Sequence, residues 1–487
     1  MSDLPFRSAK QLVAALRARK VSSQELLELY LERTKRFNPQ VNAIVWKDEE
    51  GARKRARAAD AALRRRRGSA APGALHGLPM TVKEAYDVAG MPTTWGFPDL
   101  KDHRAQRNSV VVQRFVDAGA IVFGKTNVPA GLADFQSYNA LYGTTNNPWD
   151  LARTPGGSSG GSAAALAAGL TALEAGSDIG SSIRNPAHYC GVYGHKPTWG
   201  IVSALGHAIH GWTSHGDIAV VGPLGRSADD LALALGVMGG PDPADGIGWT
   251  LSLPPARKKA LREFNVGLML SDPVGPVDQE VAAQLERLGQ FLRKRRVRVD
   301  ERARPEIDSV ESHRMFLPLL NAALSVGIPA EEFERMKEVA RSAAPGDTSS
   351  KVRLARGATL PHRDWLFLDD ARNKLRGKWA AFFEKYDLLL CPAMSTAAFP
   401  HDHEGQIFDR FVSVDGRKVP MTAQLFWAGY SGVVFLPSTV APIGRTPAGL
   451  PIGVQIIGPQ YGDRTCIAFA QLLEREYYGF VPPPGFD

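Results

Sequence analysis

Hydrophobic and polar positions follow a helical rhythm through the first part of the chain. Between residues 8 and 37, apolar side chains recur every three or four positions, which is the spacing of amphipathic helices. Ser22 stands three residues before Glu25 and predicts a capping box at the start of the second helix. A third helix, basic and alanine-rich, is expected over residues 49–63. The pattern therefore predicts that residues 1–70 are all helix and wrap around the remainder of the protein.

The rhythm changes after residue 75, where short apolar runs alternate with helical stretches. Strands are expected at residues 81–82, 121–123, 220–221, 266–270, 388–390 and 453–457. Helices are expected at residues 110–118, 162–170, 228–238 and 281–292. This alternation is typical of an α/β architecture built around one large sheet.

Size and charge change this picture little. A chain of 487 residues with 44% hydrophobic residues can bury a large core. The net charge of +8 and the pI near 9.3 raise the question of a polyanionic partner. The basic residues are scattered apart from runs at 64–67 and 293–296, each at the end of a helical stretch, where cations favour the helix dipole. We therefore expect a solvated basic surface and no nucleic-acid partner.

Cysteine usage and hydropathy indicate the compartment. Three widely spaced cysteines fit neither a zinc site nor a disulfide framework, and buried free thiols are expected; they are Cys190, Cys391 and Cys466. The first residues lack the apolar core of a signal peptide. Apolar stretches long enough for a membrane helix, about 18 residues or more, do not occur. The sequence predicts a cytoplasmic, soluble protein with no membrane association.

The candidate chemistry lies in one lysine and two serine-bearing, glycine-rich segments. Lys83 ends the stretch GLPMTVK, and the glycine-rich segments are residues 154–162, TPGGSSGGS, and residues 176–186, GSDIGSSIRNP. Glycine lets a backbone approach a reacting group closely and leaves its N–H groups free to point at a ligand. Serines on such loops, with a lysine available as base, form a plausible constellation for acyl transfer.

These segments resemble the amidase signature family of serine hydrolases. The resemblance continues through GKTN at 124–127, NPWD at 147–150, KPTWG at 196–200, GPLGRS at 222–227 and GLPIGVQIIGP at 449–459. It is dense from about residue 76 to 230 and returns after about residue 380. It implies a single domain over 1–487 with a mixed, twisted sheet covered by helices on both faces and a signature core at 75–230. The poorly matching segment 300–365 is expected to form peripheral helices over the mouth of the site.

The resemblance also implies roles for particular residues. Ser182 is the expected nucleophile, Ser158 a bridging serine joined to Gly157 by a cis peptide bond, and Lys83 the general base. The expected oxyanion hole consists of backbone N–H groups of Ile179, Gly180, Ser181 and Ser182. Burial would depress the pKa of Lys83 and make its neutral form available. Without the resemblance, Lys83 reads as a surface or paired lysine, Ser158 as a helix cap and Ser182 as a turn serine.

Neighbouring residues are expected to support the site. Asp178 and Arg184 flank the second loop with opposite charges and are expected to pair, and Ser159 is expected to support the loop. The resemblance also implies that the segment after residues 126–129 approaches the acyl side of the substrate. Its residues are Leu132, Ala133, Phe135 and Tyr138, and a core role is nearly as good for Phe135.

Two stretches of the sequence contain several histidines, and for both a role other than metal binding is favoured. Several side chains are expected to line the pocket rather than hold a metal, namely His207, His210, Trp212 and His215. Residues 401–403, HDH, are expected in an exposed loop.

Two positions depart from the commonest pattern of the family. Ser181 stands where glycine is usual, so its side chain narrows the oxyanion loop or adds a hydroxyl near the acyl group. Two adjacent serines, Ser181 and Ser182, are therefore candidates for the nucleophile. Ser182 is preferred because it directly precedes Ile183 and Arg184, as in the family. Glu84 stands where aspartate commonly follows the lysine, a milder change that is expected to alter support rather than chemistry.

The sequence therefore predicts a cofactor-independent, metal-free amidohydrolase that cleaves a small-molecule carboxamide to acid and amine or ammonia; a homo-oligomer is compatible with it. One alternative is the glutamine-hydrolysing subunit of a tRNA-dependent amidotransferase. A further alternative is an α/β-hydrolase-type esterase, since residues 156–160 also satisfy G-x-S-x-G and His401 or His403 would complete a triad. A phosphate-binding loop is weaker because Ser162 occupies the place of the required lysine. A catalytically silent scaffold is disfavoured by the intact lysine and serines.

Overall fold

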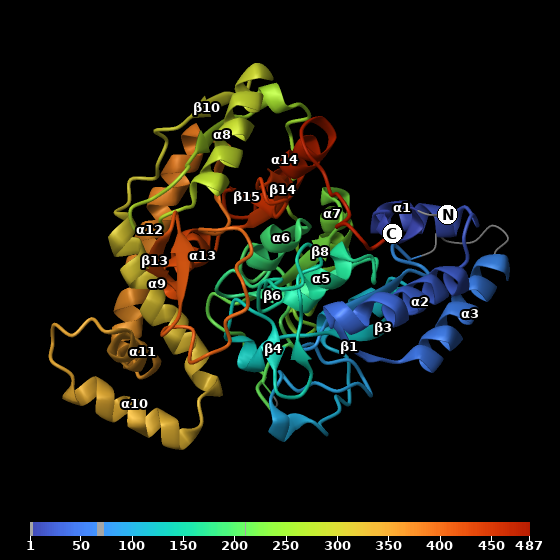
Figure 1. Ribbon diagram of the computed structural model, residues 1–487, viewed down its shortest axis with the longest axis horizontal. Coiled ribbons are helices and arrows are strands. Elements are labelled where there is room, and N and C mark those ends of the chain that lie inside the picture. Colours follow the sequence, from blue (N-terminus) through green and yellow to red (C-terminus); the bar gives the residue numbers. More distant parts are fainter. Residues whose placement is uncertain (1–2, 66–72, 210) are drawn as a thin grey trace.

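The computed structural model describes residues 3–65, 73–209 and 211–487, and it is organised around two β-sheets that meet edge to edge (Figure 1). The larger sheet has eight strands in the order β10-β9-β11-β15-β14-β7-β8-β6, with parallel and antiparallel neighbours. The smaller sheet has three strands in the order β1-β3-β2. The mixed sheet with helices on both faces confirms the fold class expected from the sequence.

The strands of the two sheets span β1 Ile44–Lys47, β2 Pro79–Lys83, β3 Ile121–Thr126, β6 Glu174–Asp178, β7 Tyr193–Lys196, β8 Val220–Gly225, β9 Asn265–Leu268, β10 Arg298–Asp300, β11 Leu388–Pro392, β14 Ser438–Arg445 and β15 Pro451–Ile457. Two hairpins are formed by β4 Tyr138–Asn139 with β5 Gly143–Thr144, and by β12 Phe411–Val414 with β13 Arg417–Pro420.

The helices span α1 Ala9–Arg17, α2 Ser23–Val41, α3 Glu49–Arg65, α4 Val110–Asp117, α5 Gly160–Ala167, α6 Arg184–Cys190, α7 Ala228–Met238, α8 Gln279–Lys294, α9 Ser309–Leu324, α10 Ala330–Ser342, α11 Ser350–Ala358, α12 His362–Lys385, α13 Leu425–Gly432 and α14 Asp463–Glu476. Every helix expected from the apolar rhythm is present. Residues 66–67 of the first basic run lie outside the described residues.

The N-terminal part of the described chain is not entirely helical. The capping box of Ser22 and Glu25 is present at the start of α2. Between α2 and α3, however, β1 pairs antiparallel with β3 and extends the small sheet. The prediction of an all-helical opening is wrong because β1 is only four residues long, too short to show a period of its own.

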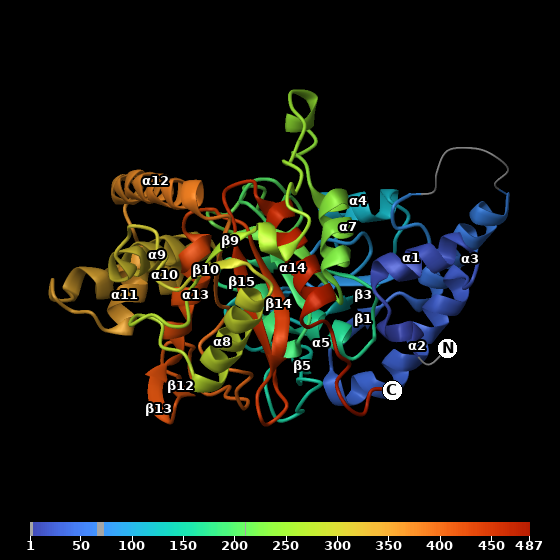
Figure 2. The same ribbon diagram turned by 90° about the horizontal axis from the view of Figure 1, so that it is seen from above.

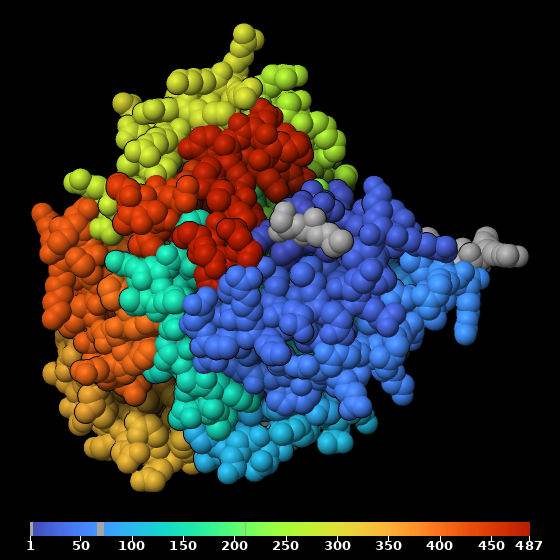
Figure 3. Space-filling model, turned by 45° about the vertical axis from the view of Figure 1, so that its right-hand side comes forward, coloured from blue at the N-terminus to red at the C-terminus, as the bar shows by residue number. Residues whose placement is uncertain are grey.

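The two ends of the described chain meet on one face. Figure 3 shows the N-terminal helices in blue beside the C-terminal residues in red. The rings of Phe37 and Phe486 lie 5.3 Å apart between centroids, so the last residues pack against α2. Cys190, Cys391 and Cys466 are buried free thiols, as predicted.

The segment with weak sequence periodicity is helical and peripheral. Residues 309–385 form α9 to α12, which lie to one side of the large sheet in both ribbon views (Figures 1 and 2). Helix α9 packs against α13, which in turn lies over the second serine loop, since a Cβ on Gly180 would come within 3.3 Å of Leu425. The peripheral helices are therefore linked to the second serine loop through α13.

The seam between the sheets positions the candidate site. Strand β6 is the edge of the large sheet, and β2, the edge of the small sheet, packs beside it. The buried side chain of Glu174 on β6 accepts a hydrogen bond from Thr81 Oγ1 on β2, and the Thr81 N–H donates to Thr171 Oγ1 at 3.0 Å. Burial raises the pKa of Glu174 to about 8, so most of this carboxyl is neutral at pH 7.

Candidate active site

Lys83 is held at the end of β2, where the small sheet meets the large one. Its ammonium nitrogen Nζ lies 2.6 Å from Ser158 Oγ and 2.9 Å from Ser177 Oγ. The side chain is fully buried, and desolvation lowers the pKa of Lys83 to about 7 against a small opposing influence of Asp178. A substantial fraction of Lys83 is therefore neutral near pH 7 and able to accept a proton.

The first serine loop presents Ser158 to this amine. The Gly157–Ser158 peptide bond is cis, and α5 begins two residues later. Ser159 occupies the cap position of α5 without making a cap bond; its Oγ instead accepts from the Ser177 N–H at 3.3 Å. Ser158 is thus not a helix cap, and Ser159 ties its loop to β6 as expected.

Glycine is required where α5 approaches β3. A Cβ on Gly161 would lie 2.4 Å from the backbone nitrogen of Asn127 and 2.6 Å from its carbonyl oxygen. Larger residues would push the first serine loop away from the small sheet that carries Lys83.

The second serine loop is shaped by a buried ion pair. Asp178 ends β6, and its carboxylate accepts from Arg184 at 2.8 and 3.0 Å and from the N–H groups of Ser181 and Ile183 at 2.9 and 3.1 Å. Burial opposes the ionisation of Asp178, but the Arg184 guanidinium outweighs it and lowers the pKa of Asp178 to about 2. The expected pair between these residues is confirmed. Both charges are fully buried, so each depends on the other for compensation.

Arg184 also fixes this loop to the rest of the protein. Its Nη1 donates to the Ala428 carbonyl at 3.1 Å, to Ser431 Oγ at 3.0 Å and to Gln455 Oε1 at 2.6 Å. The start of α6 is thereby anchored to α13 and β15.

The amides of the second loop are not equivalent. Within the described part of the chain, the N–H groups of Ile179, Gly180 and Ser182 donate to no protein acceptor, whereas that of Ser181 is engaged by Asp178. Three of the four amides expected in the oxyanion hole are therefore available in this structure, and the fourth holds the loop in place.

Ser181 departs from ordinary backbone geometry. Its φ of +83° lies in the left-handed region that favours glycine, which agrees with glycine being usual at this position. Its hydroxyl is buried and has no hydrogen-bond partner among the described residues. The added hydroxyl therefore contributes no visible bond to the loop.

Ser182 lies beside the first serine loop, and its backbone rather than its hydroxyl contacts that loop. Its carbonyl accepts from the Ser159 N–H at 3.1 Å, and its side chain is nearly buried. The hydrogen bonds of the described residues do not include one between Ser158 Oγ and Ser182 Oγ. Catalytic hydrogen bonds are often long without substrate and tighten in the complex.

The four residues expected on the acyl side have different environments. Phe135 is buried in a second apolar cluster with Tyr189, Met394 and Phe399, so its side chain is part of a core. Leu132 is half-buried with a φ of +60°, and Ala133 is exposed. Tyr138 donates to Asp134 Oδ2 at 3.2 Å.

The prediction of an exposed loop at residues 401–403 is wrong. All three residues are half-buried, the ring of His403 stacks on Tyr138 at 3.8 Å, and His401 bonds to Asn146 Oδ1 at 3.1 Å. Polar composition suggested solvent, but the rings find partners on the 138–146 segment. Ser158 Oγ is hydrogen-bonded to Lys83 rather than to either histidine, which disfavours the α/β-hydrolase alternative.

The described side chains of the histidine-bearing stretch 207–215 have separate environments and do not gather into one site. His207 packs against Tyr86 at 4.6 Å and Trp95 at 5.4 Å, while Trp212 is exposed and His215 bonds to Asp242 at 2.7 Å. His210 lies outside the described residues. Across residues 3–65, 73–209 and 211–487, His, Cys, Asp and Glu form no group of three or more arranged to hold a metal.

Two features beside Lys83 were not expected from the sequence. The first is the hydroxyl of Ser177, which is the second hydrogen-bond partner of the Lys83 amine. Ser177 stands inside one of the glycine-rich motifs, but the motif did not indicate this contact. Trp95 is held by Glu84, whose carboxylate accepts from its N–H at 2.9 Å and from the Thr94 N–H at 2.6 Å. The indole Nε1 of Trp95 and Nε2 of the adjacent His207 are buried without partners among the described residues. No local sequence signal connects residue 95 with residue 207.

Comparison with known proteins gives a family for this arrangement. The amidase family model matches residues 25–467. The chain is 33% identical to the indoleacetamide hydrolase of Bradyrhizobium diazoefficiens, covering 96% of this chain and 86% of that protein. It is 32% identical to a glutamyl-tRNA(Gln) amidotransferase subunit of Acidothermus cellulolyticus, covering 98% and 95%. A bacterial aryl acylamidase structure shares the fold with a TM-score of 0.82 at 24% identity, covering 97% and 96% of the two chains.

The sheet, the buried lysine and the paired serine loops thus define an enzyme of the amide-hydrolysing class. This chain belongs to the amidase signature family. Helices long and apolar enough to cross a membrane are not found in the described parts of the chain.

Proposed function

We propose that the protein hydrolyses a carboxamide through an acyl-enzyme on Ser182, with Ser158 and Lys83 as the proton relay. The observation that carries this proposal is the 2.6 Å contact between Lys83 Nζ and Ser158 Oγ in a site where burial brings the pKa of Lys83 to about 7. A buried amine of this kind is suited to proton transfer near neutral pH.

In the acylation step, neutral Lys83 accepts the proton of Ser158, and Ser158 takes the proton of Ser182 as the Ser182 oxygen attacks the amide carbon. The free N–H groups of Ile179, Gly180 and Ser182 stabilise the negative oxygen of the tetrahedral intermediate. One such donor contributes about 3 kcal/mol to lowering the barrier. When the C–N bond breaks, Ser158 gives a proton to the leaving nitrogen and regains one from Lys83.

Deacylation repeats the relay with water in place of the amine. Water attacks the ester carbon and gives its proton through Ser158 to Lys83. Collapse of the second intermediate releases the carboxylic acid, and the proton returns through Ser158 to Ser182. Acid and amine leave, and the lysine is neutral again.

The substrate side favours an apolar amide. Leu132 is half-buried, Trp95 is held by Glu84, the residue that follows Lys83, and His207 packs on Tyr86. A relative that spans almost the whole chain is named as a hydrolase of an indole-bearing amide. We therefore place aliphatic and aryl amides ahead of charged ones. Three free thiols are typical of a reducing compartment, so we place the activity in the cytoplasm.

A second candidate function is the glutaminase component of a tRNA-dependent amidotransferase. It is favoured by relatives named as subunits of glutamyl-tRNA(Gln) amidotransferase, to which the chain is similar over nearly its full length. The discriminating measurement is turnover by the purified chain alone. Hydrolysis of aryl or aliphatic amides without a partner supports the stand-alone enzyme, and glutamine hydrolysis that appears only with added partner proteins supports the second candidate.

The triad assignment is tested by labelling with a fluorophosphonate followed by peptide mass mapping. Label is expected on Ser182, and Ser182→Ala is expected to remain folded while losing about 10³-fold or more in kcat. The matched control is Ser181→Gly, which removes the neighbouring hydroxyl at a position whose φ suits glycine and is expected to keep activity. Near-normal turnover by folded Ser182→Ala, or label on Ser181, would refute the nucleophile assignment.

A further inference from the structure

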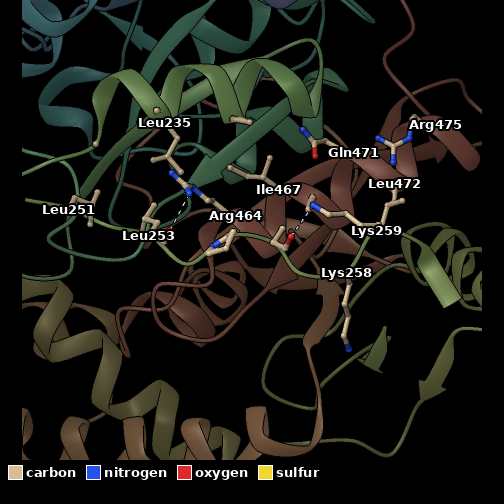
Figure 4. Close-up of a pocket in the computed structure, with 16 residues that line it drawn as sticks. Leu235, Leu251, Leu253, Lys258, Lys259, Arg464, Ile467, Gln471, Leu472 and Arg475 are labelled. Carbon is tan, nitrogen blue, oxygen red and sulfur yellow. Dashed lines mark hydrogen bonds between the residues drawn. The ribbon is translucent and has the colours of Figure 1, made fainter. Parts of the chain in front are cut away.

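A groove unrelated to the triad lies between α7 and α14. Its volume is about 490 Å³, which is within the usual range for small-molecule sites. The extended segment 251–259 forms its third side (Figure 4). None of the residues proposed for catalysis lines it.

The floor of the groove is apolar. Leu235 comes from α7, Ile467 and Leu472 from α14, and Leu251 and Leu253 from the extended segment. Contact with a hydrocarbon chain would remove this apolar surface from water, which is favourable. A hydrated inorganic ion would find no polar partners on it.

The rim of the groove is cationic. Arg464 and Arg475 stand at its two ends on α14, and Lys259 lies between them on the opposite side (Figure 4). All three are exposed, and in the described part of the chain none of them forms an ion pair. Arg464 Nη1 donates to the Leu253 carbonyl and Lys259 Nζ to the Ala256 carbonyl, each at 3.1 Å, so both meet neutral acceptors that leave their charge uncompensated.

Nearby carboxylates form no ion pair with these three cations in the described part of the chain: Glu474 lies within electrostatic reach of Arg475, but it accepts from the Ala228 N–H at 2.8 Å and burial raises its pKa to about 7. Asp or Glu is absent from the residues that line the groove. Lys258 is the lining cation that is neutralised, since it pairs with Asp387 and turns away from the other sticks in Figure 4. Glu263 accepts from the backbone N–H of Lys259 at 2.8 Å rather than from its ammonium. Asp229, which accepts from Gln471 of the groove, already pairs with Lys10 at 2.9 Å.

We propose that this groove is a binding site for a small carboxylate that carries an apolar chain, such as a medium-chain fatty acid. The carboxylate takes charge-assisted hydrogen bonds from Arg464, Arg475 or Lys259, and the chain lies on the leucine and isoleucine floor. Cations are repelled, and short acids lack the apolar contact. This site does not depend on the proposed catalytic mechanism.

The ligand chemistry is tested by calorimetry on the full chain at low ionic strength. The probes are decanoate below its micelle concentration, butyrate, and decyltrimethylammonium. We expect decanoate to bind with a Kd at least tenfold below those of the other two, and its binding to weaken as salt is raised. Equal binding of decanoate and decyltrimethylammonium overturns the carboxylate assignment, and absence of decanoate binding overturns the site.

The location is tested by charge-neutralising pairs. Arg464→Gln with Arg475→Gln is expected to raise the Kd for decanoate about tenfold or more, because each exposed cation contributes modestly. The control pair, Lys54→Gln with Arg57→Gln on the exposed face of α3, makes the same change of net charge away from the groove and is expected to leave the Kd unchanged. Equal effects of the two pairs, or no effect of either, overturn the groove as the site. Should the first pair unfold, the exposed single substitution Lys259→Gln serves in its place.

Binding in the groove and binding at the active site are separated by Ser182→Ala. This variant is expected to bind decanoate at the groove with an unchanged Kd, whatever its effect on turnover. A Kd that responds to Ser182→Ala but not to the arginine pair assigns the acid to the active site and refutes the proposal.

Discussion

Two buried lysines, Lys83 and Lys196, are both influenced by Asp178 and both have a lowered pKa, but their hydrogen-bond partners differ. Burial lowers the pKa of both Lys83 and Lys196 to about 7, with Arg184 contributing to the decrease for Lys196. Lys83 contacts two serine hydroxyls at the seam between the sheets, whereas Lys196 donates to the carbonyl of Pro197 at 3.2 Å on β7. A carbonyl has no proton to give, so Lys196 cannot act as a base toward its neighbour. The comparison teaches that a shifted pKa identifies a base only when a transferable proton lies within reach.

The largest effect is expected from exchanging these lysines for an apolar side chain of similar length. Lys83→Met is expected to lose about 10³-fold or more in kcat because the relay has no acceptor. Lys196→Met is expected to lose less than about tenfold, since it removes no proton acceptor from the relay. Steady-state rates with a common amide measure the difference, with thermal melts to show that both variants fold. Losses of equal size would mean that burial rather than contact explains the importance of Lys83.

The pH profile is expected to give the next largest effect. Only neutral Lys83 accepts a proton, so well below an apparent pKa near 7 kcat/KM is expected to fall about tenfold per pH unit, which amounts to about 50-fold from pH 7 to pH 5. The rate therefore rises with pH through neutrality and then levels. Rates measured over this range on folded enzyme check the sign, and a rate that increases on acidification would contradict a lysine base.

Removing the second hydroxyl on Lys83 is expected to cost about tenfold in kcat. Ser177→Ala leaves the amine with Ser158 as its hydroxyl partner and loosens its position. Ser177→Thr keeps the hydroxyl and is the matched control, expected to recover most of the rate. A positioning role further predicts that the apparent pKa of the pH profile moves in the alanine variant and returns in the threonine variant. If both variants behave alike, Ser177 acts only through packing.

The smallest effect is expected from a substitution of Trp95. Trp95→Phe keeps an aromatic ring, although a smaller one, and removes the unpaired Nε1 donor; it is expected to change kcat/KM by about threefold through KM. The effect should be larger for amides whose acyl group carries a hydrogen-bond acceptor besides the amide carbonyl than for amides with a purely hydrocarbon acyl group. A uniform change across such a panel would indicate that the indole nitrogen meets water rather than substrate.

The parts of the fold that were predictable from sequence are those with long, regular patterns. Helices such as α7 and α8 were found within a few residues because their apolar faces repeat over several turns. Strand order was not predictable, because it depends on side-chain packing between elements as distant in sequence as β6 and β2. The short strand β1 was missed for lack of length.

The residues of the candidate site also fall into those that the sequence indicated and those that it did not. Lys83, Ser158 and Asp178 stand in glycine-rich motifs whose order is informative, and the structure brings Lys83 to Ser158 and Asp178 to Arg184. Trp95 and His207 meet only in the folded chain, 112 positions apart, and neither stands in a motif. The half-buried 401–403 loop was misjudged because polar residues that find ring and amide partners look the same in sequence as solvated ones.

The neutral carboxyl of Glu174 is expected to make the stability of the fold depend on pH. Its pKa rises from the ordinary value of 4.5 to about 8 on folding, so the native state retains a proton that the unfolded chain releases. The free energy of unfolding is therefore expected to decline as alkalinity increases between these two values. Above pH 8 a bare negative charge lies between Thr81 and Thr126, where the two sheets join, with no cation to compensate it among the hydrogen-bond partners in the described chain. The same junction that assembles the lysine and the serines makes this enzyme sensitive to base.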